Sequence, residues 1–422
     1  MIKVLIISRT PWDNSNSFGN TFSNLFENMD GVDIYNICCQ HGTANNNVVK
    51  KAIQFTDKSV LKNVFTGKDY CRVIGNDNKV PTYDDQDITK KKLVKVKTLI
   101  LSIRDFVWKL GAWKKSKVLN DFLKEVKPDV VYLPIYASHY MCYVQSYLID
   151  KLGVPVVGHI SDDVYGIPKK AKVSFKNYRK RLQKKVSTLI SKCSYLEVFA
   201  ENMKEEYEKT FNVPCYVIGK GINVESIKPF NYSLINSNVS FVYTGNIGSE
   251  RYKSLAMLGK ALDKVYDNAV LNVYSASALT KEIENEFSKS KSIKFHGRIS
   301  REEVDEVQKQ ADYLVHVESF SDEGVFSAKM SFSTKIIDYM LMGKPIIAVG
   351  PAEVNSMQVL KNYGCAITCE NENEIEEKVK LIKDEKIDLN QLSNNVYNYL
   401  VEYRNIKTIQ QGIKQRLQSL IK

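Results

Sequence analysis

Short apolar runs alternate with helix-type patterns along nearly the whole chain. In the first half, apolar runs of strand length lie at 3–8, 32–38, 129–135, 154–160, 195–200 and 215–220. Apolar residues at helical spacing fill the stretches between them, at 138–151, 172–193 and 201–210. Apolar strands that alternate with helices are typical of a parallel sheet covered on both faces. We therefore predict such a sheet for the first half.

The same alternation returns after a polar interval. Residues 221–238 lose the periodicity and contain Pro229, which indicates a linker. Strand-like runs follow at 239–245, 269–276, 292–297, 313–318, 345–350 and 365–370, with helical stretches that include 300–311 and 387–421. We predict an α/β fold of two Rossmann-like domains, whose parallel sheets face each other across a cleft. The predicted boundaries are 1–228 and 236–397, and a C-terminal helix at about 398–422 crosses back to the first domain.

Size and charge narrow the class of protein. With 422 residues the chain exceeds what one hydrophobic core usually fills. The net charge is +12, but residues 88–117 hold ten Lys or Arg and only Asp105, so the remainder carries just +3. This local basicity argues against a nucleic-acid partner. No apolar run reaches the roughly 18 residues of a membrane span, and Met1 leads directly into a strand, which predicts a cytoplasmic protein.

The basic stretch 88–117 has the pattern of an amphipathic helix. Its apolar residues follow i, i+3, i+4 spacing and lysines flank both ends; the apolar positions are Leu93, Val96, Ile100, Ile103, Val107 and Leu110. Such a helix binds an anionic membrane surface, so we predict a peripheral membrane protein. The alternative is an ordinary helix packed on the first domain with a solvated basic face.

The eight cysteines form no repeated Cys-x2-Cys pair, so we predict buried thiols and no metal site.

A loop with glycines and cations follows the first strand of the second half. It reads GNIGSERYK at 245–253, with Gly245, Asn246 and Gly248 in the loop and Arg251 and Lys253 near the next helix start. Glycines permit close backbone approach, and two cations can clamp a diphosphate. An ordinary strand-to-helix turn with surface charges explains the pattern almost as well.

A second candidate lies in SFSTKIIDYMLMGKPIIAVG, residues 331–350. Here Ser331, Ser333 or Thr334 can cap a helix and leave further N–H groups for a phosphate. Asp338, one turn later among apolar neighbours, can accept both hydroxyls of a ribose. The alternative is an i,i+3 ion pair between Asp338 and Lys335, although an unpaired acid in apolar surroundings is costly.

These residues resemble a known family, the glycosyltransferases of GT-B fold, especially the bacterial family-four-like enzymes of capsule, O-antigen and exopolysaccharide assembly. Those enzymes carry a helix that ends in Glu-Ala/Tyr-Met-x-x-Gly-Lys-Pro-x-Ile, and the chain reads DYMLMGKPII from Asp338. They also carry a glycine turn followed by basic residues, which Gly245 to Lys253 resembles. The resemblance implies a nucleotide-diphosphate sugar as co-substrate and no cofactor or metal.

The resemblance also implies roles for single residues. Asp338 looks like the ribose-binding acid, and Arg251 and Lys253 look like diphosphate contacts that stabilise the departing group. Residues 331–335, which include Lys335, look like the loop over phosphate and sugar. One departure concerns the Glu-x7-Glu motif, whose first acid is replaced by Met330, so the donor sugar and the retaining outcome are left open. Glu318 and Glu323 are possible substitutes, or else loop surface charges.

The first domain is expected to bind the acceptor. The polar loop 9–20 resembles the family's glycine-rich first loop, with Gly19 and Asn20 as contacts; a merely flexible loop is the alternative. After the strand at 154–160, His159 is predicted to contact the acceptor, and Asp162 or Asp163 to act as general base. Either acid can instead cap the helix that follows.

Together these features predict a glycosyltransferase that moves a sugar from a nucleotide-diphosphate sugar to a hydroxyl of a lipid-linked saccharide. The reaction would belong to cell-surface polysaccharide synthesis at the inner face of the plasma membrane. Two alternatives are a nucleotide-sugar 2-epimerase of the same fold, and a non-catalytic partner protein that keeps the fold without the missing acid.

Overall fold

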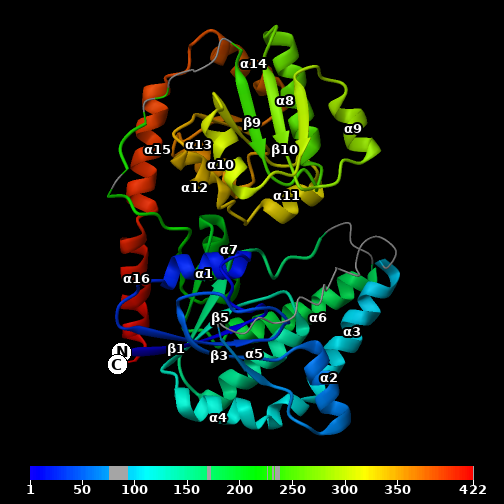
Figure 1. The fold of residues 1–422 in the computed structure, drawn as a ribbon, viewed down its shortest axis with the longest axis vertical. Helices are drawn as coiled ribbons and strands as arrows, with labels where there is room; N and C mark the ends of the chain where they lie inside the picture. The colour runs from blue at the N-terminus through cyan, green and yellow to red at the C-terminus, as the bar shows by residue number, and fades with distance from the viewer. Residues whose placement is uncertain (76–93, 169–172, 226, 231, 233–237, 422) are drawn as a thin grey trace. The chain divides into compact units, whose positions relative to one another are not determined.

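The chain folds into two compact units in the computed structural model, which describes residues 1–75, 94–168, 173–225, 227–230, 232 and 238–421 (Figure 1). Unit 1 comprises Met1–Phe199, Met203–Gly221 and Ile406–Lys422, and unit 2 comprises Ala200–Asn202 and Ile222–Asn405. Each unit has its own sheet and its own clusters of buried apolar side chains. The predicted α/β fold with two mainly parallel sheets is confirmed.

The sheet of unit 1 has the strand order β4-β3-β2-β1-β5-β6-β7-β8. Its strands are β1 Ile2–Ser8, β2 Val32–Cys38, β3 Val49–Gln54, β4 Arg72–Ile74, β5 Val130–Pro134, β6 Val156–Ile160, β7 Tyr195–Val198 and β8 Cys215–Val217. Neighbouring strands are parallel except β3 and β4. The sequence prediction missed β3 and β4, because Lys50 and Lys51 interrupt the apolar pattern of β3 and β4 is only three residues long.

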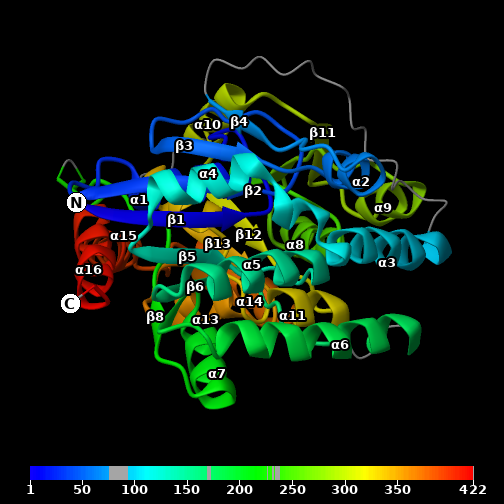
Figure 2. The ribbon, with the colours of Figure 1, turned by 90° about the horizontal axis from the view of Figure 1, so that it is seen from below.

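Helices cover the sheet of unit 1. They are α1 Ser17–Phe26, α2 Asp57–Thr66, α3 Val94–Leu110, the 3-10 helix η1 Ala112–Lys115, α4 Lys117–Val126, α5 His139–Leu152, α6 Val173–Ile190, α7 Glu201–Phe211 and α16 Ile406–Ser419. Helices α1 and α16 contribute Phe22, Leu25, Ile413 and Leu417 to one buried cluster with β1. Helix α5 contacts both α3 and α6, and Figure 2 shows α5 and α6 running side by side.

Unit 2 has an all-parallel sheet in the order β11-β10-β9-β12-β13-β14. Its strands are β9 Ser240–Thr244, β10 Val270–Tyr274, β11 Ile293–Gly297, β12 Tyr313–Val317, β13 Ile346–Val349 and β14 Ile367–Cys369. Its helices are α8 Arg251–Val265, α9 Lys281–Phe287, α10 Arg301–Lys309, α11 Asp322–Ala328, α12 Lys335–Leu341, α13 Asn355–Asn362, α14 Glu372–Lys383 and α15 Leu389–Tyr403. Two buried clusters, one around Leu255 and one around Ile336, share the side chains of these strands.

The predicted helical tail 387–421 is two helices. Helix α15 ends at Tyr403, because the carbonyl of Arg404 accepts a 2.7 Å hydrogen bond from the backbone N–H of Ile222 and so leaves the helical pattern. Helix α16 then belongs to unit 1, as the predicted crossing requires.

The predicted burial of the cysteine thiols is confirmed, because all eight cysteines are buried and free. Among the described residues, none of the helices combines the length and the apolarity that a membrane span requires. The predicted amphipathic helix 88–117 is α3 followed by η1, and its residues 88–93 lie outside the described residues.

Candidate functional site

The loops after β9, β10, β11 and β12 meet at the carboxyl edge of the sheet in unit 2. The strand order runs outward from β9 to β11 in one direction and from β12 to β14 in the other. The chain therefore changes direction between β9 and β12, and ligands of open α/β sheets bind outside the strands at such a point. The residues that follow β9 and β12 are the natural candidates for the site.

The loop after β9 is closed by the side chain of Asn246. Its Oδ1 accepts a 2.6 Å hydrogen bond from the N–H of Gly248 and a 3.0 Å bond from the hydroxyl of Ser277, which follows β10. Before α8, Ser249 and Glu250 have φ values of 52° and 63°, in the left-handed region that non-glycine residues rarely adopt. Such backbone persists only where its surroundings hold it, and it concentrates at functional sites.

Lys335 brings a cation directly to this loop. Its Nζ donates a 3.2 Å hydrogen bond to the carbonyl of Thr244 and lies 5.6 Å from the centre of the Tyr243 ring. A Cβ at Gly245 would lie only 2.2 Å from this Nζ, so glycine is what lets the ammonium approach the backbone. Although the residue is exposed, local desolvation of the ammonium and the positive charge of Arg251 lower the pKa of Lys335.

Buried side chains hold Thr244 at the end of β9. The hydroxyl of Tyr339, on α12, donates to the carbonyl of Thr244 at 3.1 Å and lies 3.1 Å from its Oγ1. Gln308, on α10, donates to the same Oγ1 at 2.7 Å. Because Tyr339 and Lys335 share α12 and both contact Thr244, the short helix is fixed against the strand end.

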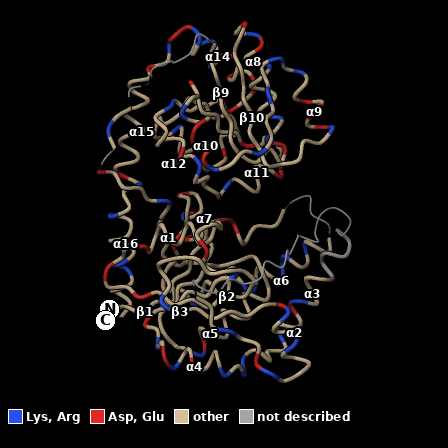
Figure 3. Tube along the Cα trace, viewed as in Figure 1, with Lys and Arg blue, Asp and Glu red and all other residues tan. Residues whose placement is uncertain are grey.

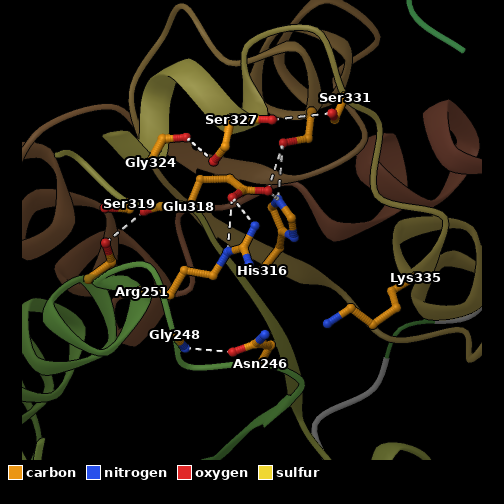
Figure 4. A network of polar contacts seen from close by, with 12 residues as sticks. Asn246, Gly248, Arg251, His316, Glu318, Ser319, Gly324, Ser327, Ser331 and Lys335 are labelled. Carbon is orange, nitrogen blue, oxygen red and sulfur yellow. Dashed lines mark hydrogen bonds and ion pairs between the residues drawn. The ribbon is translucent and has the colours of Figure 1, made fainter. Parts of the chain in front are cut away.

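Arg251 is paired with Glu318, which follows β12 (Figure 4). The Nε and Nη2 of Arg251 lie 3.0 and 2.8 Å from Oε2 of Glu318. Glu318 is only 4% exposed, and its Oε1 lies 3.5 Å from both Nε2 of His316 and Oγ of Ser356. The interpretation of Glu318 as a loop surface charge is therefore wrong, because the carboxylate neutralises a partly buried guanidinium.

The other predicted diphosphate contacts are placed differently. Lys253 lies on the exposed side of α8 and pairs with Glu250 at 3.1 Å. The side-chain cap expected from Ser331, Ser333 or Thr334 is wrong, because Thr334 occupies the N-cap position with helical backbone angles and makes no side-chain capping bond. The first turn of α12 is instead closed by hydrogen bonds to the backbone carbonyls of Ser333 and Thr334. Figure 4 shows Arg251 within the polar network and Lys335 apart from it.

Asp338 lies on α12, half-buried between the buried Ile337 and Tyr339. Met330, at the position where the family motif has its first acid, is half-buried. Of the two upstream acids considered as substitutes, Glu323 is exposed and Glu318 is buried. The described structure therefore offers Glu318 as the buried carboxylate nearest to the loop after β12.

A pocket of about 530 Å³ opens beside this loop. Its walls are residues 244–246, 274–277 and 298–299, with Val304 and Lys335. Sequence reasoning named Gly245, Asn246 and Lys335 but missed Tyr274, Ser277 and Arg298. Their signal was available, because all three stand at or just after the carboxyl ends of predicted strands, where ligands bind. Asp338 is not among the described residues that line the pocket.

The ring of Tyr274 is fixed by a neighbour on the adjacent strand. It stacks on His296 with ring centres 4.6 Å apart and an angle of 15°, and His296 in turn contacts Asn272 at 2.8 Å. The pocket therefore combines a held aromatic ring with hydroxyls from Ser275 and Ser277 and the cations Arg298 and Lys335. This mixture suits a ligand that carries a planar base, hydroxyl groups and negative charge.

In unit 1, His159 belongs to a buried chain of hydrogen bonds. Its Nδ1 lies 3.0 Å from the Tyr132 hydroxyl, which donates to Glu197 at 2.5 Å, and its Nε2 lies 3.0 Å from Oγ of Ser161. Because the Tyr132 proton goes to Glu197, His159 donates from Nδ1 and accepts at Nε2. Burial lowers the pKa of His159 to about 3, so the ring is neutral. Both ring nitrogens are occupied within unit 1, which leaves the predicted acceptor contact without a free atom.

The two aspartates after β6 differ in their surroundings. Asp163 accepts hydrogen bonds from the N–H groups of Tyr165 and Gly166 and from the hydroxyl of Tyr207 at 2.9 Å. It therefore closes a turn, and the predicted helix cap is wrong because the next helix, α6, begins only at Val173. Asp162 is exposed.

The predicted loop 9–20 is shorter than expected. Helix α1 begins at Ser17, so Gly19 and Asn20 are helical. The N–H of Gly19 donates to the N-cap Asn16 at 2.8 Å, and a Cβ at Gly19 would lie 2.0 Å from the carbonyl oxygen of Asp13. Gly19 is thus required for close packing, and its N–H is already used in the cap, while Asn20 is exposed.

Among the described residues, no group of three or more His, Cys, Asp or Glu could hold a metal ion.

The comparisons with known proteins agree with this arrangement of the second unit. Residues 238–384 match the family described as "Glycosyl transferases group 1". No curated protein matches the sequence.

Solved structures of similar fold cover the whole chain. They include sucrose-phosphate synthase from Thermosynechococcus elongatus, with a TM-score of 0.60 and 12% identity over 100% of this chain and 99% of that one. Anabaena Alr3699/HepE, solved in complex with UDP-glucose, gives a TM-score of 0.60 and 12% identity over 100% of both chains. An α,α-trehalose-phosphate synthase from Burkholderia xenovorans, in complex with glucose-6-phosphate, gives 0.58 and 8% over 99% and 100%. The chain therefore has the two-domain GT-B fold of these glycosyltransferases, and its residues 238–384 carry a glycosyl transferases group 1 domain.

Proposed function

We propose that this protein transfers a sugar from a nucleotide-diphosphate sugar to a hydroxyl of a lipid-linked saccharide acceptor in cell-surface polysaccharide synthesis. The observation that carries the donor half of this proposal is the pocket at the carboxyl edge of the sheet in unit 2. It lies over the ends of β9, β10 and β11, next to the change of chain direction between β9 and β12, and it joins a fixed aromatic ring, hydroxyls and two cations. A neighbour of the same fold is described with bound UDP-glucose, which supports a nucleotide-sugar donor.

In the proposed reaction the acceptor oxygen attacks the anomeric carbon of the donor sugar. The bond from that carbon to the phosphate oxygen breaks, and the nucleoside diphosphate leaves with the electron pair. Negative charge develops on the departing diphosphate, so fixed cations there stabilise the transition state most. We assign this role to Lys335, which lines the pocket. Arg251, which is paired with Glu318, and Lys253 are proposed as further diphosphate contacts, and Gly245 and Asn246 as the backbone that approaches the phosphates.

The remaining assignments rest on the resemblance. Asp338 is proposed to bind the ribose, and residues Ser331, Ser333 and Thr334 to lie over phosphate and sugar. In unit 1, Asp162 or Asp163 is proposed to act as general base; Asp163 also accepts three hydrogen bonds that close a turn. The proposed reaction needs no metal or other cofactor, because the cations are supplied by the chain.

A sugar phosphate is the second candidate acceptor. Two neighbours of the same fold are described as sucrose-phosphate and trehalose-phosphate synthases, and a sugar phosphate offers the same attacking hydroxyl. Assays with a soluble sugar phosphate and with a lipid-linked saccharide, each with the same donor, distinguish the two classes by which one releases nucleoside diphosphate.

The donor proposal is tested by thermal unfolding with UDP, GDP, ADP, CMP and dTDP. A ligand that binds only the folded chain adds about 2.7 kcal/mol to the free energy of unfolding at 100 times its Kd, so one base should raise the Tm and the others should not. Calorimetric titration of that nucleotide into Asp338→Asn then tests the ribose contact. If no nucleoside diphosphate raised the Tm of a folded sample, the donor proposal would be wrong and a non-catalytic role would be favoured.

A further inference from the structure

Helix α3 exposes an apolar stripe to solvent. Four large side chains on one side of the helix are more than half exposed: Ile100 52%, Ile103 56%, Phe106 61% and Leu110 53%. Their spacing of three or four residues places them on one helical face. Single exposed apolar residues are common, but a contiguous patch of this kind marks an interaction surface.

The orientation of α3 is set by polar groups on its opposite side. Asp105, only 7% exposed, accepts a 3.0 Å hydrogen bond from the hydroxyl of Tyr178. Trp108, 1% exposed, donates from Nε1 to Asp57 of α2 at 2.6 Å. The helix therefore buries the carboxylate of Asp105 and the indole of Trp108, and its apolar stripe faces solvent. The expectation that an ordinary α3 would pack its apolar face on the first domain is wrong for these residues.

Helix α6 lies next to α3 and carries the charge. Tyr178, which bonds to Asp105, belongs to α6, and Figures 1 and 2 show the two helices side by side with their N-terminal ends on the same side of unit 1. Residues 173–190 contain six Lys or Arg and no acid, and Figure 3 marks Lys and Arg along the chain in blue. Val173 and Phe175 at its start are 75% and 38% exposed.

The basic residues around α6 show that positive charge is not confined to residues 88–117. Residues 169–192 hold ten further Lys or Arg and no Asp or Glu. Lys180, Arg181 and Lys184 are exposed, and none of them takes part in an ion pair within the part of the chain that the structure describes. The apolar stripe and an uncompensated basic helix therefore occur together on neighbouring elements.

We propose that the outward sides of α3 and α6, here called the α3–α6 face (Ile100, Ile103, Phe106, Leu110, Lys180, Arg181 and Lys184), dock on a membrane that contains anionic lipids. The apolar side chains would enter the boundary between headgroups and acyl chains, while the basic residues contact lipid phosphates. A nucleic acid would match the charge but not the exposed aliphatic stripe. The proposal deepens the proposed function, because a lipid-linked acceptor requires the enzyme to work at such a surface.

Flotation with vesicles tests the proposal on the full chain. Vesicles of phosphatidylcholine with 30% phosphatidylglycerol should carry the protein upward, and vesicles of phosphatidylcholine alone should carry it far less. Each basic residue near an anionic surface contributes roughly fivefold to partitioning. The variant K180Q/R181Q/K184Q should therefore lower partitioning about 100-fold, and 1 M salt should have a similar effect.

Matched variants separate the surface from general charge and from misfolding. The control K281Q/K291Q/K386Q removes the same charge from exposed positions of unit 2 and should float like wild type. The variant I103S/F106S, which changes only exposed side chains, should lower partitioning at least about tenfold with an unchanged Tm. Equal loss in the control, or unchanged flotation of both face variants, would overturn the proposal, as would wild-type protein that binds duplex DNA or self-associates through this face instead of binding vesicles.

The outcome is independent of the donor site. If the protein ignored anionic vesicles while a nucleoside diphosphate still raised its Tm, docking would be refuted and the proposed donor would stand. If it floated but bound no nucleoside diphosphate, the docking surface would stand and the proposed function would fail.

Discussion

At the scale of single residues, the donor site depends on two positions that are 90 residues apart. Gly245 lacks the Cβ that would lie 2.2 Å from Nζ of Lys335, and Lys335 reaches the carbonyl of Thr244 because that space is open. Neither residue is informative alone, since glycines in turns and lysines at helix starts are common. Together they place a positive charge at the carboxyl end of β9.

Removal of the Lys335 ammonium should weaken diphosphate binding. A hydrogen bond to a charged group contributes roughly 1.5–3 kcal/mol, so we expect Lys335→Ala to raise the Kd of the bound nucleoside diphosphate about 10- to 100-fold in a calorimetric titration. Lys281→Ala, an exposed change in the same unit, should leave the Kd unchanged. If Lys253→Ala raised the Kd more than Lys335→Ala did, the diphosphate clamp of Arg251 and Lys253 that the sequence pattern suggested would be favoured instead.

A substitution at Gly245 should have a similar effect by displacing the Lys335 ammonium without removing it. In Gly245→Ala the new methyl displaces the end of a flexible side chain, which costs little stability. We expect a Kd at least about fivefold higher and a Tm within about 2 °C of wild type, measured by titration and by thermal unfolding. An unchanged Kd would mean that the position of Nζ does not matter for binding.

At the scale of elements, α16 is tied to unit 1 by a buried charge pair. Glu197 on β7 has no exposed side-chain area, and Nη2 of Arg416 lies 2.6 Å from its Oε1. The other carboxylate oxygen accepts from Tyr132, which contacts His159. The ion pair between Arg416 and Glu197 therefore holds the C-terminal helix on unit 1, and local sequence patterns do not show this pair.

Breaking this pair should destabilise unit 1. Arg416→Met leaves a carboxylate buried without its cation, which typically costs about 3–5 kcal/mol, and urea unfolding followed by circular dichroism would measure the loss. Lys414→Gln removes the same charge from the same helix and should cost less than about 1 kcal/mol. The double variant Arg416→Met/Glu197→Gln should recover part of the loss, and a cost equal to that of Arg416→Met alone would argue against the pair.

The pattern of apolar and polar residues predicted most helices and strands, because these elements depend on residues that are close together in the chain. Twelve apolar runs that we predicted as strands are strands in the structure, at nearly the expected bounds. They could be predicted because buried strands and amphipathic helices each have a characteristic spacing of apolar residues along the chain. The errors at α15 and α3 have tertiary causes. Helix α15 stops where Ile222 takes the carbonyl of Arg404, and the stripe of α3 faces outward because Asp105 and Trp108 find partners on α6 and α2.

At the scale of the whole molecule, each unit contains a buried neutral histidine. Burial lowers the pKa of His159 in unit 1 to about 3 and that of His316 in unit 2 to about 4, although Glu318 opposes the second shift. In the unfolded chain both take up protons near pH 6.5. Between about pH 4 and 6.5 the unfolded state therefore binds more protons, and stability rises with pH.

Acidification should consequently destabilise both units. We expect each histidine to cost roughly 2 kcal/mol of unfolding free energy between pH 7 and pH 5, with the full contribution present above pH 6.5. Urea unfolding at pH 7, 6 and 5 would measure it. His159→Gln should be destabilised at pH 7 yet lose about 2 kcal/mol less than wild type on acidification, so an identical pH dependence of the two proteins would contradict the neutral buried ring.

The sequence by itself determined the order of the elements, the division into two α/β halves, the burial of the cysteines and the resemblance carried by residues 331–350, because these follow from local periodicity and short motifs. Only the tertiary structure decided which polar side chains share a site. It paired Arg251 with Glu318, brought Lys335 to Gly245, used the N–H of Gly19 in a helix cap and enclosed His159. Those outcomes depend on contacts between residues that are remote in the chain, and the desolvation of each charge is set by the surroundings that folding creates.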